Sequence, residues 1–317
     1  MSLSTDVPRG PDPDPDPGPG PGPEPDSQSP DGRAPDQDPG GRTGARRSRP
    51  PGERVRFGVS PAALGVVVLW VSILVALPIA ALVATSLTGG PRGFWAAVTR
   101  PSALAALGIT LALAAGVALL NAVAGTVIAW VLVRDDFRGK QLIDALIDLP
   151  FALPTIVASI VLLSLYGPES PVGVHLAGTR AGVAMALAFV TLPFVVRAVQ
   201  PVMRELDDDA EEAAASLGAP GWTIFRRIIW PVLLPAVASG TGLSFARAIG
   251  EFGSVVLIGG NLPGRTQIAS QYIQQLIEVG DPASAAAVSV VLLVVSFAVL
   301  TTLRLVSDRT QRREEAS

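Results

Sequence analysis

Residues 211–235 read EEAAASLGAPGWTIFRRIIWPVLLP and lie between two long apolar segments. Acidic residues come first, where they favour the positive end of a helix dipole, and alanines of high helix propensity follow. Gly218 stands where a left-handed residue is expected to end this helix, and a proline two residues later is allowed in the first turn of the next. Pro231 and Pro235 mark the passage into the following apolar segment. The stretch therefore predicts a helix–turn–helix elbow over residues 203–235.

The surrounding chain is too apolar for an ordinary soluble protein. Of its 317 residues 49% are hydrophobic and 16% are charged, and the mean hydropathy is +0.45. Apolar runs of about 20 residues cross a hydrocarbon core of about 30 Å as helices, because lipid offers no partners to free backbone groups. The composition predicts an all-α integral membrane protein with six transmembrane helices. The predicted spans are 61–86, 103–133, 143–166, 181–202, 235–258 and 284–305.

The distribution of arginine sets the orientation. With both termini inside, the segments on the cytoplasmic side carry most of the arginines, as the positive-inside rule requires. The external segments then hold only Arg92, Arg100, Arg180 and Arg265. This N-in, C-in arrangement places the elbow in the cytoplasm. Ala213 and Ala214 give it a flat face that suits insertion into a partner's groove, and an amphipathic connector lying on the membrane is the alternative.

The chain divides into four predicted regions. Residues 1–56 form a Pro/Asp/Gly-rich tail, expected to be disordered, whose basic end is either a solvated linker or attracted to anionic membrane lipid. Residues 57–102 hold the first span and an external loop. Residues 103–306 form the transmembrane core, and residues 307–317 form a cytoplasmic C-terminal tail.

Several chemistries are excluded by composition. The chain has no cysteine and one histidine, which excludes thiolate or His-rich metal sites and a His-based catalytic triad built from this chain alone. No glycine-rich loop ending in Lys-Ser or Lys-Thr occurs, so the chain is not expected to bind ATP. We expect no catalytic residue, no bound metal and no cofactor held by this chain, and we expect it to be a subunit that is not an enzyme.

Glycine and proline mark unusual positions within the spans. Gly108, Gly116 and Gly125 suit a close approach of the second span to its neighbours. Pro150 and Pro154 are expected to kink or unwind the third span. Irregular backbone at that depth lies against protein or a watery cavity, so this helix either lines a path or is kinked only for packing.

The elbow resembles the cytoplasmic pattern of permease subunits of ATP-binding-cassette importers. That pattern is EAA, three residues, Gly, nine residues, Ile, one residue and Leu-Pro. The matching residues here are Glu212, Ala213, Ala214, Gly218, Ile228 and Pro231. Trp230 replaces the usual leucine, which keeps the position apolar. The resemblance implies the type I importer permease (MetI-like) fold over residues 60–305, with the elbow docked into an ATPase subunit.

Two further stretches resemble the T-type subunit of sulfate/thiosulfate permeases. They are DLPFALPTIVASIVLLSLYGPES (148–170) and ARAIGEFGSVVLIGGNLPGRTQIASQYI (246–273). The resemblance implies a multi-pass protein of the bacterial cytoplasmic membrane that imports sulfate, and thiosulfate, with ATP-Mg used by a partner. The implied partners are two ATPase subunits, a homologous second (W-type) permease subunit and an extracytoplasmic sulfate-binding protein; no nucleic acid is involved. A molybdate or tungstate permease, or a secondary transporter, are the alternatives.

A path for a dianion needs hydrogen-bond donors that do not hold it tightly. Asn121, Thr155, Ser159 and Ser254 are the candidates, each alternatively a hydrogen-bonding partner of a neighbouring helix.

Two pairs of ionisable residues lie four positions apart. Arg247 and Glu251 are predicted on one helix face, where Arg247 either meets the anion or is neutralised by Glu251 in a gate. Asp144 and Asp148 are expected to reach interfacial water.

Overall fold

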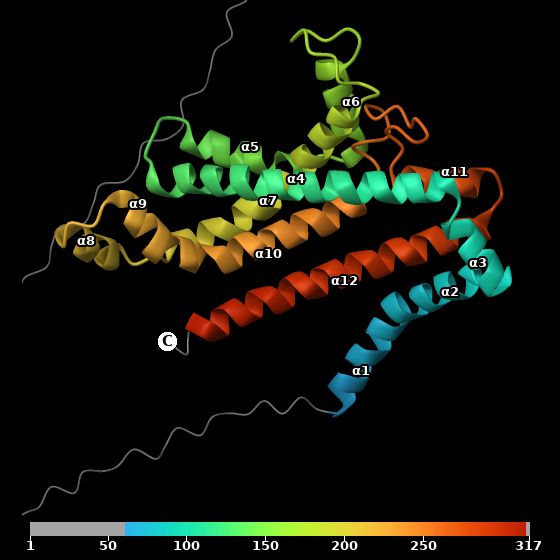
Figure 1. The fold of residues 1–317 in the computed structure, drawn as a ribbon, viewed down its shortest axis with the longest axis horizontal. Helices are drawn as coiled ribbons and strands as arrows, with labels where there is room; N and C mark the ends of the chain where they lie inside the picture. Colours follow the sequence, from blue (N-terminus) through green and yellow to red (C-terminus); the bar gives the residue numbers. More distant parts are fainter. Residues whose placement is uncertain (1–60, 315–317) are drawn as a thin grey trace, which may run out of the picture. The chain divides into compact units, whose positions relative to one another are not determined.

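A computed structural model describes residues 61–314, and every regular element within them is a helix (Figure 1). The predicted tail, residues 1–56, lies outside the described residues. The helices are α1 (Pro61–Val71), α2 (Leu77–Ser86), α3 (Gly90–Val98), α4 (Pro101–Arg134), α5 (Lys140–Ala152), α6 (Thr155–Tyr166), α7 (Arg180–Arg204), α8 (Asp208–Ser216), α9 (Gly221–Ile224), α10 (Trp230–Ile249), α11 (Ala269–Glu278) and α12 (Pro282–Glu314). Two π-helical turns, Ser72–Ala76 and Phe225–Ile229, join α1 to α2 and α9 to α10.

Five helical segments in the described part are long and apolar enough to cross a membrane. A sixth span results if α5 and α6, between which the chain bends by 117°, together make one broken crossing and not a re-entrant loop. This agrees with the six predicted spans and with the break expected at Pro150 and Pro154. Pro150 lies inside α5, and Pro154 precedes the first residue of α6, where its fixed φ and missing N–H suit a helix start.

The prediction of a fifth span over residues 235–258 is wrong. The helix runs without interruption from Gly221 to Ile249, and residues 250–268 form turns and irregular backbone. The π-helical turn shifts the local hydrogen bonds, so that the Trp230 amide reaches the Phe225 carbonyl, and such adjustments accommodate prolines within a helix. Beyond Ile249 the chain stays apolar but is rich in glycine, which disfavours helix and explains the early end.

The core is formed where α4, α7 and α10 pack against one another (Figure 1). α12 packs on α10, and α2 and α3 pack on α12. Close approach depends on Gly125 of α4 and Gly240 of α10, since a Cβ on either would overlap atoms of Val195 in α7. The expectation for Gly125 is therefore confirmed. For Gly108 and Gly116 it is wrong, because a Cβ there would meet no atom within 4 Å.

Replacing Gly240 by alanine is expected to destabilise the helix core. The new Cβ would lie 2.9 Å from the Val195 Cα, which is backbone and moves only with the whole helix. Overpacking of this kind costs about 1–3 kcal/mol, partly offset by the roughly 1 kcal/mol that alanine gains over glycine in a helix. Thermal unfolding in detergent measures the change. Gly116→Ala is the matched control, since it brings the same helix propensity into open space, and equal melting temperatures for the two variants would contradict the packing argument.

Candidate functional site

The predicted elbow is present and turns at Gly218. The Asp207 side chain begins α8 by accepting a hydrogen bond from the Asp209 amide at 3.0 Å. Gly218 has φ +81°, in the left-handed region that glycine occupies readily, and its amide donates to the Ala215 carbonyl at 2.9 Å. Pro220 then precedes α9. The turn is therefore built as the sequence predicts.

The base of the elbow is held to the end of α4 by contacts that sequence reasoning missed. Arg134 forms ion pairs with Glu211 and, at 3.3 Å, with Asp208. Its guanidinium also lies 5.5 Å from the ring centroid of Trp130, within cation–π range. Asp208 and Glu211 are more than seventy residues from Arg134 in the chain, so only the tertiary structure brings these carboxylates to it.

An aromatic cluster stiffens the second half of the elbow. Phe225 stands in its centre, with its ring centroid 5.6 Å from Trp222, 5.7 Å from Trp130 and 6.0 Å from Trp230. Trp230 is the residue that replaces leucine in the importer pattern. Its side chain packs on Phe225, so the replacement extends an aromatic contact between elbow and helix instead of leaving a defect.

The tip of the elbow presents small side chains beside one large apolar residue. Glu212, Ala213 and Gly218 are exposed, and Ala214 is half-buried. Leu217, between the alanines and the turn, is 90% exposed. A protruding leucine close to small alanine side chains is the arrangement expected of a helix that enters a partner's groove. Leu217 was not among the predicted residues because its exposure depends on how the helix ends.

The last two residues of the importer pattern lie away from this tip. Ile228 is half-buried in the π-helical turn, and Pro231 lies in the first turn of α10. The six matched positions therefore divide into four at the tip and two in the continuous helix that leads into the membrane.

The bend between α5 and α6 contacts the irregular segment 250–268. The Ser159 hydroxyl, fully buried in α6, accepts hydrogen bonds from the amides of Leu257 at 3.1 Å and Ile258 at 3.4 Å. A Cβ on Gly253 would overlap the side chain of Thr155, the first residue of α6. Thr155 and Ser159 thus position this segment, and the glycine allows its backbone to approach the start of α6.

Arg247 and Glu251 form the expected ion pair, but not on one helix face. Arg247 lies in the last turn of α10, and Glu251 lies two residues beyond its end. The Glu251 carboxylate, only 1% exposed, also accepts a hydrogen bond from the Ser254 amide at 2.8 Å. The backbone carbonyl of Glu251 accepts one from the Ser270 hydroxyl at 2.7 Å. Arg247 is 34% exposed. Among the described residues the buried Ser254 hydroxyl has no hydrogen-bond partner.

Asn121 links two helices of the core. Its buried amide donates to the Thr191 hydroxyl at 2.8 Å and to the Ala188 carbonyl at 3.2 Å, both in α7. Both amide hydrogens are thereby used between α4 and α7. Of the four predicted polar candidates, Asn121 stands apart, whereas Thr155, Ser159 and Ser254 gather around segment 250–268 with Glu251.

A charged cluster lies where α5 packs on α7, and the sequence did not predict it. Arg197 of α7 binds Asp144 and Asp148 of α5, with nitrogen–oxygen distances of 2.8 Å and 2.5 Å, and Gln200 joins them. We refer to these four residues as the Arg197 cluster. The expectation that Asp144 and Asp148 serve only to reach interfacial water is therefore wrong. Each side chain remains partly exposed but is oriented by the arginine.

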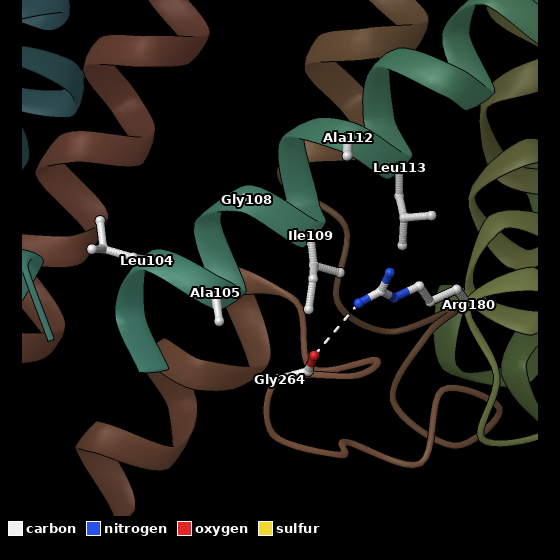
Figure 2. Close-up of a pocket in the computed structure, with 8 residues that line it drawn as sticks. All are labelled: Leu104, Ala105, Gly108, Ile109, Ala112, Leu113, Arg180 and Gly264. Atoms are coloured by element: carbon white, nitrogen blue, oxygen red, sulfur yellow. Dashed lines mark hydrogen bonds between the residues drawn. The ribbon is translucent and has the colours of Figure 1, made fainter. Parts of the chain in front are cut away.

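An apolar groove of about 430 Å³ runs along the first turns of α4 (Figure 2). Arg180, at the start of α7, reaches across it and donates to the carbonyls of Arg265 at 2.8 Å and Gly264 at 3.5 Å. Gly108 faces this groove, which explains why it makes no close helix contact. The lining residues are Leu104, Ala105, Gly108, Ile109, Ala112, Leu113, Arg180 and Gly264.

The N-terminal ends of α4 and α12 are joined by an ion pair at the surface. Arg100, just before α4, lies 3.2 Å from Asp281, which precedes α12 and accepts the Ser284 amide at 3.1 Å. Hydrogen bonds from Ser284, and then the charge of Arg100, hold the pKa of the Asp281 carboxyl below its usual value.

Comparison with known proteins gives a consistent picture. Residues 122–312 match the profile of the binding-protein-dependent transport system inner membrane component family. The chain is 42% identical over 250 residues to the sulfate transport system permease protein CysT of Synechocystis sp., covering 77% of this chain and 87% of that one. It is 40% identical over 257 residues to the protein of the same name in Escherichia coli, covering 79% and 93%.

Solved structures share the fold at low sequence identity. A bacterial alginate transporter of the ATP-binding-cassette class aligns with a TM-score of 0.66 and 16% identity, over 78% of this chain and 93% of that one. The methionine transporter MetNI in an inward-facing conformation aligns with a TM-score of 0.52 and 17% identity, over 65% and 94%. Both alignments support the arrangement of helices described above.

Proposed function

Because the chain belongs to the family of binding-protein-dependent transport system inner membrane components, we propose that it is the permease subunit through which an ATP-driven importer moves sulfate across the cytoplasmic membrane. Sulfate is inferred as the cargo because the chain is 40–42% identical to the two sulfate permeases over most of the length of each. The protein is a multi-pass inner membrane protein and a transport subunit. Thiosulfate, a dianion of similar shape, is a second expected cargo.

The elbow supports a complex in which an ATPase subunit hydrolyses ATP and this chain forms the path for the anion. We infer that Glu212, Ala213, Ala214, Leu217 and Gly218 dock into the ATPase subunit that binds ATP-Mg, while Ile228 and Pro231 pass its movement into α10. Two ATPase subunits, a W-type second permease subunit and an extracytoplasmic sulfate-binding protein complete the proposed complex. The similarity to importer permeases over most of their length supports these partners in general terms.

The candidate path residues fall into two classes. Ser254 keeps an unpartnered hydroxyl beside the Arg247–Glu251 pair, and this supports a role near the path. The hydrogen bonds of Asn121 and Ser159 to other parts of the protein support a positioning role instead. Pro150 and Pro154, with Thr155, shape the bent helix that carries Ser159. We infer that segment 250–268 and this bend together form the gate.

Uptake by the reconstituted complex tests the proposal. Proteoliposomes with the two permease subunits, the ATPase and the binding protein are expected to accumulate radiolabelled sulfate only with ATP-Mg, and thiosulfate is expected to compete. ATP-dependent uptake of radiolabelled molybdate, with no uptake of radiolabelled sulfate, would overturn the proposed cargo in favour of the molybdate or tungstate alternative. Uptake driven by an ion gradient without ATP would support a secondary transporter, which the family membership argues against.

A further inference from the structure

The Arg197 cluster uses every hydrogen-bond donor of its guanidinium. The Arg197 Nε–H donates to Asp148 at 2.8 Å, and the two terminal nitrogens donate to Asp144, Asp148 and Gln200, and to the Asp144 backbone carbonyl. These are five bonds for five N–H groups, four of them to α5. Gln200 closes the cluster by donating to Asp144 at 3.0 Å. Such an arginine has no free donor for a transported anion, so its role is to hold two helices together.

This cluster lies within the membrane-spanning part of α7. Arg197 is seven residues before Arg204, the end of the helix, which corresponds to about 10 Å along its axis. Charged side chains at such depth are costly and face protein or water, not lipid. Two carboxylates and one guanidinium give the cluster a formal charge of −1. Without the arginine, two unpaired carboxylates would lie at this depth in the membrane.

The helices that it joins have different neighbours. α7 leads through three residues into α8, the first helix of the elbow. α5 is the first half of the bent helix, and the second half, α6, holds segment 250–268 through Ser159. A continuous set of contacts therefore connects the elbow to this segment by way of Arg197.

Little else joins α5 to α7 by directed contacts. Among the described residues, the side-chain hydrogen bonds from α5 to other helices all involve Asp144 or Asp148. Beyond these, Ile147 is buried in the core and Phe151 meets Phe194 edge-on at 5.2 Å. Leu142 and Leu146 are exposed. Without Arg197, α5 would keep its apolar contacts but lose its fixed register on α7.

We propose that Arg197 is a positioning residue for transport: it fixes α5 on α7 so that a displacement of the elbow moves the bent helix and, through Ser159, segment 250–268. The proposal rests on the proposed function, because it assumes that an ATPase moves the elbow. It assigns to the cluster a part in coupling and not in anion binding.

Arg197→Lys in the assembled importer tests this role. Lysine keeps the charge but carries its three donors on one nitrogen, so it cannot hold both carboxylates in the two-pronged geometry of a guanidinium. The ratio of ATPase rate with binding protein to rate without it is expected to fall about fivefold or more, the size of a lost coupling. Arg100→Gln is the matched control, because it breaks an exposed arginine–aspartate pair between other helices and is expected to leave the ratio unchanged.

A covalent link between α5 and α7 tests whether the effect of Arg197 comes from holding the helices in position or from its charge. The chain has no cysteine, so Asp148→Cys with Arg197→Cys creates one defined thiol pair. The ratio is expected to fall in this variant and to recover when a short bis-maleimide bridges the two thiols, with bridging verified by mass spectrometry. A normal ratio in Arg197→Lys or before bridging, or no recovery after complete bridging, would overturn the proposal.

The same preparation distinguishes a failure of this inference from a failure of the proposed function. Sulfate uptake by the unaltered complex is measured first. An unaltered complex whose ATPase responds to binding protein but which carries no sulfate contradicts the cargo, while the ratio still tests Arg197. Normal sulfate uptake together with a normal ratio in the Arg197 variants contradicts the inference alone.

Discussion

Replacing Glu251 by glutamine is expected to reduce sulfate uptake about 100-fold. The buried carboxylate neutralises Arg247 and accepts the Ser254 amide at 2.8 Å, so it ties the end of α10 to segment 250–268. An amide still accepts the Ser254 hydrogen but leaves Arg247 without a counter-charge. Breaking a fully buried pair costs about 3–5 kcal/mol; because the unpaired Arg247 is 34% exposed, we expect the low end of this range, which at about 1.4 kcal/mol per factor of ten is about 100-fold. Initial rates of uptake in proteoliposomes measure the loss.

Two further variants test whether the unpaired charge of Arg247 causes the loss of uptake in Glu251→Gln. The double variant Arg247→Gln with Glu251→Gln carries neither charge. We expect its uptake to be at least about tenfold faster than that of Glu251→Gln, because no unpaired charge remains. Glu278→Gln is the matched control, since Glu278 only accepts a hydrogen bond from Gln274 on the surface of α11. Unchanged uptake in Glu251→Gln would show that the pair has no part in the gate.

Replacing Leu217 by alanine is expected to weaken docking of the ATPase subunit about 10- to 100-fold. Leu217 is 90% exposed in this chain, so truncation removes no contact within the chain and is expected to leave its melting temperature unchanged. If the side chain is buried on docking, its loss costs about 1.5–3 kcal/mol. Titration of detergent-solubilised permease with purified ATPase measures the affinity.

The control for this variant is an equally exposed apolar residue at another place. Val279, 70% exposed at the end of α11, lies on the predicted external side, and Val279→Ala is expected to leave the affinity unchanged. Equal affinity of Leu217→Ala and the unaltered permease would mean that the tip of the elbow is not the docking surface.

Features with local causes were predictable from the sequence. The spans follow from runs of apolar residues, the left-handed turn follows from Gly218, and the break of the third span follows from Pro150 and Pro154. The Arg247–Glu251 pair was found because its members are close in the chain. In each case the physical cause lies within a few residues of its effect.

The remaining features depend on contacts between distant segments. Arg197 was not singled out, because nothing near it in the sequence shows that Asp144 and Asp148 will lie beside it. The fifth span was placed too far along the chain, since hydropathy continues past Ile249 while helix propensity does not. The helix α11 was not predicted because it is short and amphipathic and lies outside the apolar runs that define the spans.

The uninterrupted helix from Gly221 to Ile249 has a mechanical consequence. Its 29 residues extend about 42 Å, from the aromatic cluster of the elbow to Ile249, two residues before Glu251. A rigid rod of that length, tilted by about 5° about its elbow end, displaces its far end by about 4 Å. That distance is comparable to the separation between turns of a helix, so a rotation too small to disturb the packing beside the elbow suffices to change which groups meet Glu251.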